Sequence, residues 1–331
     1  MSASPLVAIT ARYSEWMRVR HLAMKPEVAG REWQFEFEKK SIGIRLPPMP
    51  APDQKAGDER ALATIDHWNS KGEIASMYVY GLGISIYSLG LKIPDIAAKT
   101  SQINMSLFDA AQSDSLNAVS DRCYMRARRA VNHWLRVARW LVNGPLLDID
   151  FRESRGSFGD ELINEKTNTR FWRSPASRTL SGLRRYTVDT DSWEKLDAAL
   201  KAGQEPPIWE DYKASAERRI DGGDFVAATL DLAIAAESAV RRAVDLSLPA
   251  TSSIHIRNVI SKFPMSQVLR DWKKFGLPSP TGATPFDKQA IERLFAVRNG
   301  LMHQGAESTV TAAWCRERVV DVKNLVRALH G

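Results

Sequence analysis

The 331-residue sequence contains only two cysteines, Cys123 and Cys315, and they lie far apart along the chain. So few cysteines exclude a disulfide scaffold and a cysteine-based zinc site, and they favour a reducing compartment. The first five residues also lack the basic and apolar segments of a signal peptide. We therefore expect a cytoplasmic protein.

Long apolar runs and cofactor motifs are missing as well. No run of about 18 apolar residues is present, which argues against a membrane-spanning helix and a membrane partner. The six histidines show no metal-ligand spacing such as HExxH, and neither GxGxxG nor GxxxxGK occurs. We expect no metal and no cofactor.

What the chain does have is a moderate excess of positive charge, +7 with a pI of about 9.4. A basic protein is suited to a polyanion, so RNA is a candidate partner. The alternative is an ordinary soluble basic protein, and net charge alone does not distinguish it from an RNA-binding one.

The first 205 residues predict a mixed α/β domain. Strict alternation places Trp33, Phe35 and Phe37 on one side of a strand over residues 32–38, and residues 41–46 are expected to pair with it. Residues 13–20 fit a helix or a strand. Further strands are predicted at 77–87, 146–151, 169–172 and 184–188, and helices at 58–69, 115–143 and 191–201.

The helix predicted over residues 115–143 is rich in arginines interleaved with aromatic residues, and Ser113, Asp114 or Ser115 is expected to cap it. Arginine beside aromatic rings suits RNA, because phosphate contact and base stacking combine. The candidate RNA-binding residues are Arg126, Arg129 and Arg136. The structural alternative is an amphipathic helix with a solvated basic face and aromatic core contacts.

Residues 203–207, Gly-Gln-Glu-Pro-Pro, predict the domain boundary, and residues 206–331 predict an all-α bundle. Asp224 is expected to cap the long helix over 225–248, and Ser252 or Ser253 to open the next. The predicted helices are 209–220, 225–248, 253–263, 266–275, 286–303 and 309–330.

Two helices of this bundle carry a charge within an apolar face. A helical wheel places Arg298 near the middle of the face formed by Ile291, Leu294, Phe295, Val297, Leu301 and Met302, with Asn299 and His303 on one edge. On the helix over 225–248 the misfit is Glu237. A buried unpaired charge costs several kcal/mol, about the cost of breaking a buried ion pair, so Glu237 and Arg298 are expected to meet or to share a polar pocket.

The sequence Arg298-Asn299-Gly300-Leu301-Met302-His303, followed by Gly305, resembles the signature of HEPN-domain proteins. The likeness covers residues 206–331 and includes the helix with its inward Glu237 and a final amphipathic helix. It implies a small helical bundle, metal-independent ribonuclease activity, and a dimer in which two motifs face each other across a cleft. Residues 1–205 contain no motif that points to a known family.

The function predicted from these residues is endoribonuclease activity of a toxin or phage-defence effector. A histidine can take the ribose 2′-OH proton or protonate the leaving oxygen, and an arginine can stabilise the charge of the transition state. The candidate catalytic residues are Arg298, Asn299, His303 and Glu237. Residues 1–205 would sense or position RNA, and a neutralising or regulatory protein partner is expected.

The spacing of Arg298 and His303 sets a geometric condition. Five residues separate them, about 140° around a straight helix, so the two side chains diverge. Either the helix ends near Gly300 and bends, or the pocket is composite, which favours a homodimer. The alternative function is a non-catalytic interaction or dimerisation module fused to a ligand-recognition domain.

Overall fold

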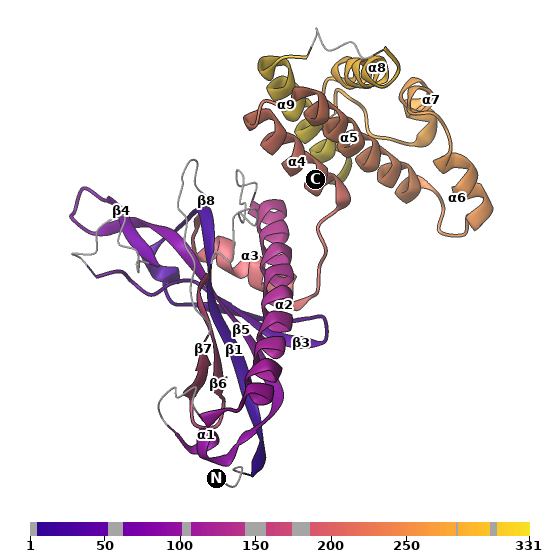
Figure 1. Ribbon diagram of the computed structural model, residues 1–331. Helices are drawn as coiled ribbons and strands as arrows, with labels where there is room; N and C mark the ends of the chain where they lie inside the picture. Colours follow the sequence, from indigo (N-terminus) through magenta and orange to yellow (C-terminus); the bar gives the residue numbers. More distant parts are fainter. Residues whose placement is uncertain are drawn as a thin grey trace. The chain divides into compact units, whose positions relative to one another are not determined.

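A computed structural model describes residues 5–51, 62–100, 107–142, 157–173, 186–282, 284–304 and 310–331. The chain divides into two compact units, Met1–Glu205 and Pro206–Gly331. The first unit contains an antiparallel sheet with helices and the second is helical, so the fold is α+β followed by all-α (Figure 1).

The N-terminal sheet is built on two long strands, β1 (Leu6–Met24) and β5 (Ile74–Pro94), which pair antiparallel along most of their length. The order is β2-β3-β5-β1-β6-β7, with β4 paired to β5 and β8 parallel to β1. The remaining strands are β2 (Glu32–Phe37), β3 (Lys40–Arg45), β4 (Ala63–Trp68), β6 (Ser157–Asn164), β7 (Thr169–Arg173) and β8 (Tyr186–Val188).

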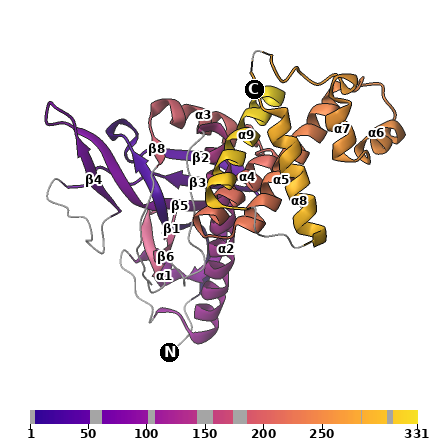
Figure 2. The ribbon, with the colours of Figure 1, turned by 90° about the horizontal axis from the view of Figure 1, so that it is seen from above.

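In the described part of this unit the sheet is accompanied by the helical elements η1 (Pro26–Val28), α1 (Asp95–Lys99), α2 (Ala110–Val142) and α3 (Thr190–Lys201). Both views place the long α2 along β1 and β5 (Figures 1 and 2). Residues 13–20, which fit a helix or a strand from sequence, belong to the strand β1. Its odd-numbered side chains from Ala11 to Val19 are buried, as a strand with one covered face requires.

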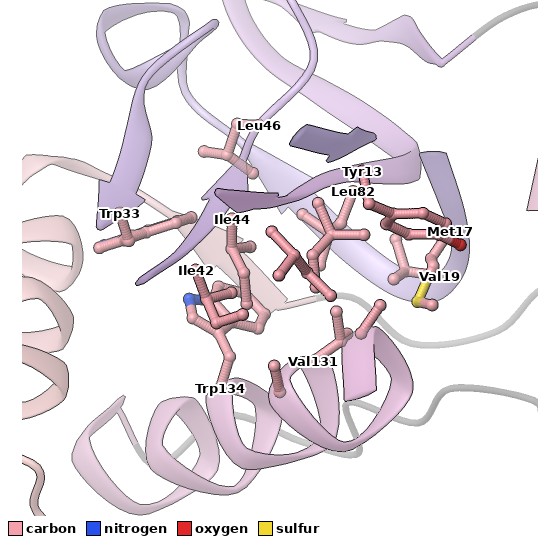
Figure 3. Close-up of a cluster of buried hydrophobic side chains, with 14 of the residues drawn as sticks. Tyr13, Met17, Val19, Trp33, Ile42, Ile44, Leu46, Leu82, Val131 and Trp134 are labelled. Atoms are coloured by element: carbon pink, nitrogen blue, oxygen red, sulfur yellow. The ribbon is translucent and has the colours of Figure 1, made fainter. Parts of the chain in front are cut away.

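The core of the N-terminal unit lies between the sheet and α2. Trp134 of α2 is fully buried and points toward Ile42 and Ile44 of β3, and Val131 lies beside Leu82 (Figure 3). The Trp33 ring stacks on Trp193 of α3 at a centroid distance of 3.7 Å. Both helices therefore cover the same face of the sheet.

The predicted strands at 32–38, 41–46, 77–87 and 169–172 and the helix at 191–201 are confirmed as β2, β3, part of β5, β7 and α3. The helix predicted at 58–69 is wrong, because Ala63–Trp68 forms β4. The overhanging end of β5 offers unpaired backbone groups there, and pairing of Ala63 with Val79 overrides the local helical pattern. Residues 146–151 and 58–61 lie outside the described residues.

Helix α2 begins earlier than predicted. Its first turn is closed by Asp109 and Gln112, since the Gln112 N–H donates to Asp109 Oδ1 at 2.8 Å and the Asp109 N–H donates to Gln112 Oε1 at 3.1 Å. This reciprocal pair is a capping box with glutamine at its third position. Ser113, Asp114 and Ser115, the predicted caps, lie inside the helix.

The C-terminal unit packs its helices around α5, which contacts α4, α8 and α9. Its elements are α4 (Ile208–Asp221), α5 (Phe225–Ser247), α6 (Ile254–Ser261), α7 (Met265–Arg270), η3 (Trp272–Phe275), α8 (Lys288–Gln304) and α9 (Ala312–His330). The predicted caps Asp224 and Ser253 are confirmed: each side chain accepts a backbone N–H of its own first turn.

Candidate active site

Helix α8 carries the candidate motif, and its buried side faces the core of the helical unit. Ile291 and Leu294 are fully buried and Phe295 nearly so, while Val297 and Leu301 are partly buried. Met302, expected on the same face, is 59% exposed. The buried face is therefore narrower than the helical wheel predicts, and the motif lies along its border with solvent.

Arg298 lies half-buried at this border. Its Nη1 donates to the Asn299 side-chain oxygen at 3.0 Å, and Asn299 itself is exposed. No carboxylate within the described part of the unit comes within ion-pair distance of Arg298. Its guanidinium thus keeps donors that no acid satisfies.

This makes Arg298 an exception among the cations of its unit. Five other lysine and arginine side chains described there are half-buried or buried, and each has an acidic partner within 4.0 Å: Lys213 with Glu210, Arg241 with Glu237, Arg257 with Asp245, Lys288 with Glu292, and Arg318 with Asp321. A partly desolvated cation without an acid is a site that favours an anion.

Glu237 does not pair with Arg298. Its Oε1 accepts from Arg241 Nη2 at 2.6 Å and from Arg241 Nε at 2.8 Å, one turn along the same helix. The prediction that the two misfit charges meet is wrong. The spacing of four residues between Glu237 and Arg241 is the sequence signal that could have found the true partner.

The buried side of α5 is also rotated from the predicted one. Asp231, which the helical wheel assigned to the polar side, is buried and accepts from Arg219 Nε of α4 at 2.8 Å. The Glu237 side chain is 30% exposed. Because α4, α8 and α9 all pack against α5, its covered surface is wider than the apolar stripe alone suggests, and the polar residue that is buried is Asp231.

His303 lies in the last turn of α8, and its side chain is outside the described part of the structure. The helix continues through Gly300 to Gln304 instead of ending at the glycine. The five-residue spacing from Arg298 therefore keeps its angular separation of about 140°. The prediction that the helix ends near Gly300 is therefore wrong, and the composite pocket stays a prediction.

A cavity of about 490 Å³ lies between α5, α6 and α7, and neither Arg298 nor Glu237 lines it. Val244, Leu248 and Val268 form its apolar walls. Two arginines link α6 to α5 beside this cavity. Arg241 of α5 donates to the Ser261 and Phe263 carbonyls, and Arg257 of α6 donates to the Pro249 carbonyl and to Asp245. No residue of α6 is buried.

The three arginines proposed to bind RNA all have acidic neighbours. Arg129 Nε and Arg126 Nε lie 2.7 and 3.3 Å from the carboxylate of Glu38, which sits in the tight turn between β2 and β3 with φ +49°. The hydrogen bond from Arg129 is the main reason that the pKa of Glu38 is lowered. Arg136 Nη1 lies 3.2 Å from Glu205 Oε2. Glu38 is thus shared by two of these arginines, and Glu205 also lies 3.4 Å from His133.

Searches against protein-family models, curated proteins and solved structures gave no match. In the part of the chain that the structure describes, no three His, Cys, Asp or Glu side chains are grouped as a metal site would need. None of the described helices combines the length and the apolar character needed to cross a bilayer.

Proposed function

We propose that residues 206–331 form a HEPN-type, metal-independent endoribonuclease that acts as a homodimer. The observation that carries the proposal is Arg298, a half-buried cation with no acidic partner among the described residues of its unit. A phosphodiester oxygen would supply the missing charge. The His303 backbone lies on the same helix, at the end that also carries Asn299.

The chemistry assigned to these residues is transfer of the phosphoryl group to the neighbouring 2′-oxygen. His303 removes the 2′-OH proton or protonates the 5′-oxygen that leaves, so the product carries a 2′,3′-cyclic phosphate. Arg298 stabilises the negative charge on the phosphoryl oxygens in the transition state. Asn299 holds the Arg298 guanidinium through its side-chain oxygen. Glu237 acts at most through Arg241, which it binds.

A second copy of the chain resolves the geometry. Because Arg298 and His303 diverge on one helix, each catalytic set would combine the arginine of one protomer with the histidine of the other. RNA cleavage of this kind fits a toxin or phage-defence effector, restrained by a regulatory partner or by the N-terminal unit.

The test is RNA cleavage by the full-length protein in EDTA. We expect Arg298→Ala and His303→Ala to lower the rate at least about 100-fold, as loss of a charge-stabilising or proton-transferring group does. Arg293→Ala is the matched control, since it removes a cation from the same helix that is paired with Asp287. Cleavage that survives in both site variants would overturn the proposal.

One observation favours the alternative, a non-catalytic dimerisation module. Ile254, Ile256 and Val259 of α6 are 73%, 48% and 46% exposed, which is a large apolar surface for so short a helix. If α6 rather than α8 joins two copies, Ile256→Asp would abolish the dimer while the wild-type protein cleaves no RNA. Dimers that persist in Ile256→Asp, with cleavage, would remove this alternative.

A further inference from the structure

The N-terminal sheet has one face covered by helices and one that is not. Trp33 marks the covered face, because its ring contacts both Trp134 of α2, at a centroid distance of 5.1 Å, and Trp193 of α3. Residues adjacent to the buried ones in β1, β3 and β5 point to the opposite face. On that side Gln34 and Arg45 are exposed, and Trp16 and Tyr87 are half-buried.

On the uncovered face, three residues lie in one row across three strands. Arg45 of β3 is opposite Gly83 of β5, and Gly83 is opposite Trp16 of β1. A Cβ on Gly83 would lie 3.1 Å from Trp16 Cζ3, so the indole lies flat over the glycine. The Arg45 guanidinium carbon lies 5.0 Å from the Trp16 ring centroid. The result is a layered stack of backbone, indole and guanidinium.

A second aromatic ring lies on the same face, beside an acid. A Cβ on Gly43 would collide with the Glu32 carboxylate and come within 3.1 Å of Tyr87 Cε2, so this glycine makes room for the Glu32–Tyr87 pair. The Tyr87 hydroxyl donates to Glu32 Oε1 at 2.6 Å. Burial raises the pKa of Tyr87, the bond to Glu32 adds to this, and the nearby charge of Arg12 opposes it. The ring is therefore a neutral phenol fixed in place.

The cations of this face differ from those of α2. Arg45 is exposed, and neither Arg45 nor Arg12 has a carboxylate within ion-pair distance in the described part of the chain. Arg12 Nη2 donates to the Asn168 side-chain oxygen at 2.9 Å, while its Nε is buried without a partner. Glu32, which lies opposite Arg45 in the β2–β3 pair, accepts the hydrogen bond from Tyr87.

We propose that this face binds single-stranded nucleic acid. Bases stack on Tyr87 and on the Trp16–Arg45 layer, and Arg12 and Arg45 contact phosphates. Flat rings with neighbouring unpaired arginines suit unstacked bases, whereas a duplex hides the faces of its bases. This surface would bind nucleic acid without cleaving it. The proposal therefore does not depend on the ribonuclease activity proposed for α8.

The experiment is fluorescence anisotropy with the full-length protein and a 2′-O-methyl RNA oligonucleotide of about a dozen nucleotides, roughly one binding site. Such an oligonucleotide has no free 2′-OH, so cleavage cannot interfere. We expect Trp16→Ala and Arg45→Ala each to weaken binding about tenfold, the effect of losing one stacked base. The same strand in a duplex should bind more weakly.

Lys201→Ala is the control, because this lysine belongs to the same unit but is paired with Asp197 at 2.7 Å. Its affinity should stay within about twofold of the wild type, the loss expected of a compensated surface cation. If Trp16→Ala fails to fold, the affinities of Arg45→Ala and Arg45→Glu test the proposal instead, because Arg45 is exposed and its substitution should not disturb folding. Wild-type affinity in the Arg45 variants, or a wild-type protein that binds no single strand or binds duplex better, would overturn the proposal.

Discussion

Glu237 binds Arg241, one turn along α5, with 2.6 Å between Oε1 and Nη2. Among the described residues Arg298 of α8 therefore has no acidic partner, and Arg241 also donates to the carbonyls of Ser261 and Phe263 at the end of α6 and just beyond it. A register-fixing ion pair between α5 and α8 is therefore not what holds the helical unit together. The two arginines should respond to mutation in opposite ways.

Arg298→Ala should change the free energy of unfolding by no more than about 0.5 kcal/mol, because the bond it breaks is to the exposed side chain of its neighbour Asn299. Arg241→Ala should cost about 1–3 kcal/mol, because Glu237 and the Ser261 and Phe263 carbonyls lose their donor. Urea unfolding of both variants measures the difference. A larger loss for Arg298→Ala would show that this arginine is structural.

The stack of Trp33 on Trp193 should be a main contributor to the stability of the N-terminal unit. Trp193 is 8% exposed and Trp33 is fully buried. Trp193→Ala should cost about 3–5 kcal/mol, the usual loss for a buried tryptophan. Trp68→Ala is the control, since Trp68 is 48% exposed on β4, and chemical unfolding should show a loss several-fold smaller. Equal losses would contradict the assigned core.

His133 should make stability depend on pH. It is buried against the Phe37 ring, and burial lowers its pKa, while Glu205 at 3.4 Å works in the opposite direction. Below the ordinary imidazole pKa of about 6.5, the unfolded chain takes up a proton that the folded chain does not. Stability should therefore fall as the pH falls from about 6.5 toward the folded pKa of His133.

The measurement is the free energy of unfolding over a pH series, for the wild type and for His133→Gln. The variant lacks the titrating group, so its stability should decline less over this window. Identical slopes for the two proteins would show that His133 does not titrate differently in the folded state.

Gly300→Ala tests whether α8 continues unbroken through its glycine. A Cβ at this position would meet nothing within 4 Å, and the residue lies inside the helix. Alanine should therefore stabilise the protein by about 0.5–1 kcal/mol. Ala296→Gly, at an exposed position of the same helix, should cost a similar amount. Thermal melts that show destabilisation by Gly300→Ala would contradict a straight helix with open space there.

Local signals in the sequence predicted local structure well. Asp224 and Ser253 cap their helices as expected, because a cap depends on residues within one turn. The alternation of Trp33 and Phe35 predicts β2 for the same reason. The capping box of Asp109 and Gln112 also lies within one turn, so the sequence contains the signal for the earlier start of α2.

Errors arose where the deciding contact is distant in the chain. The strand β4 forms because β5 offers an edge to Ala63 and its neighbours, which no local pattern reveals. A helical wheel for α5 cannot show that Arg219 of α4 binds Asp231. The wheel therefore predicts Glu237, and not Asp231, as the buried acid. The row of Arg45, Gly83 and Trp16 exists only through the register of three strands.

In the proposed dimer, Arg298 of one copy and His303 of the other act on one phosphodiester. The most direct test is RNA cleavage by Arg298→Ala, by His303→Ala, and by an equimolar mixture of the two after subunit exchange. We predict that each variant is inactive alone and that the mixture recovers up to about a quarter of wild-type activity, since half of the dimers regain one of two intact sites. A mixture as inactive as its components, or a single variant as active as the wild type, would contradict the account.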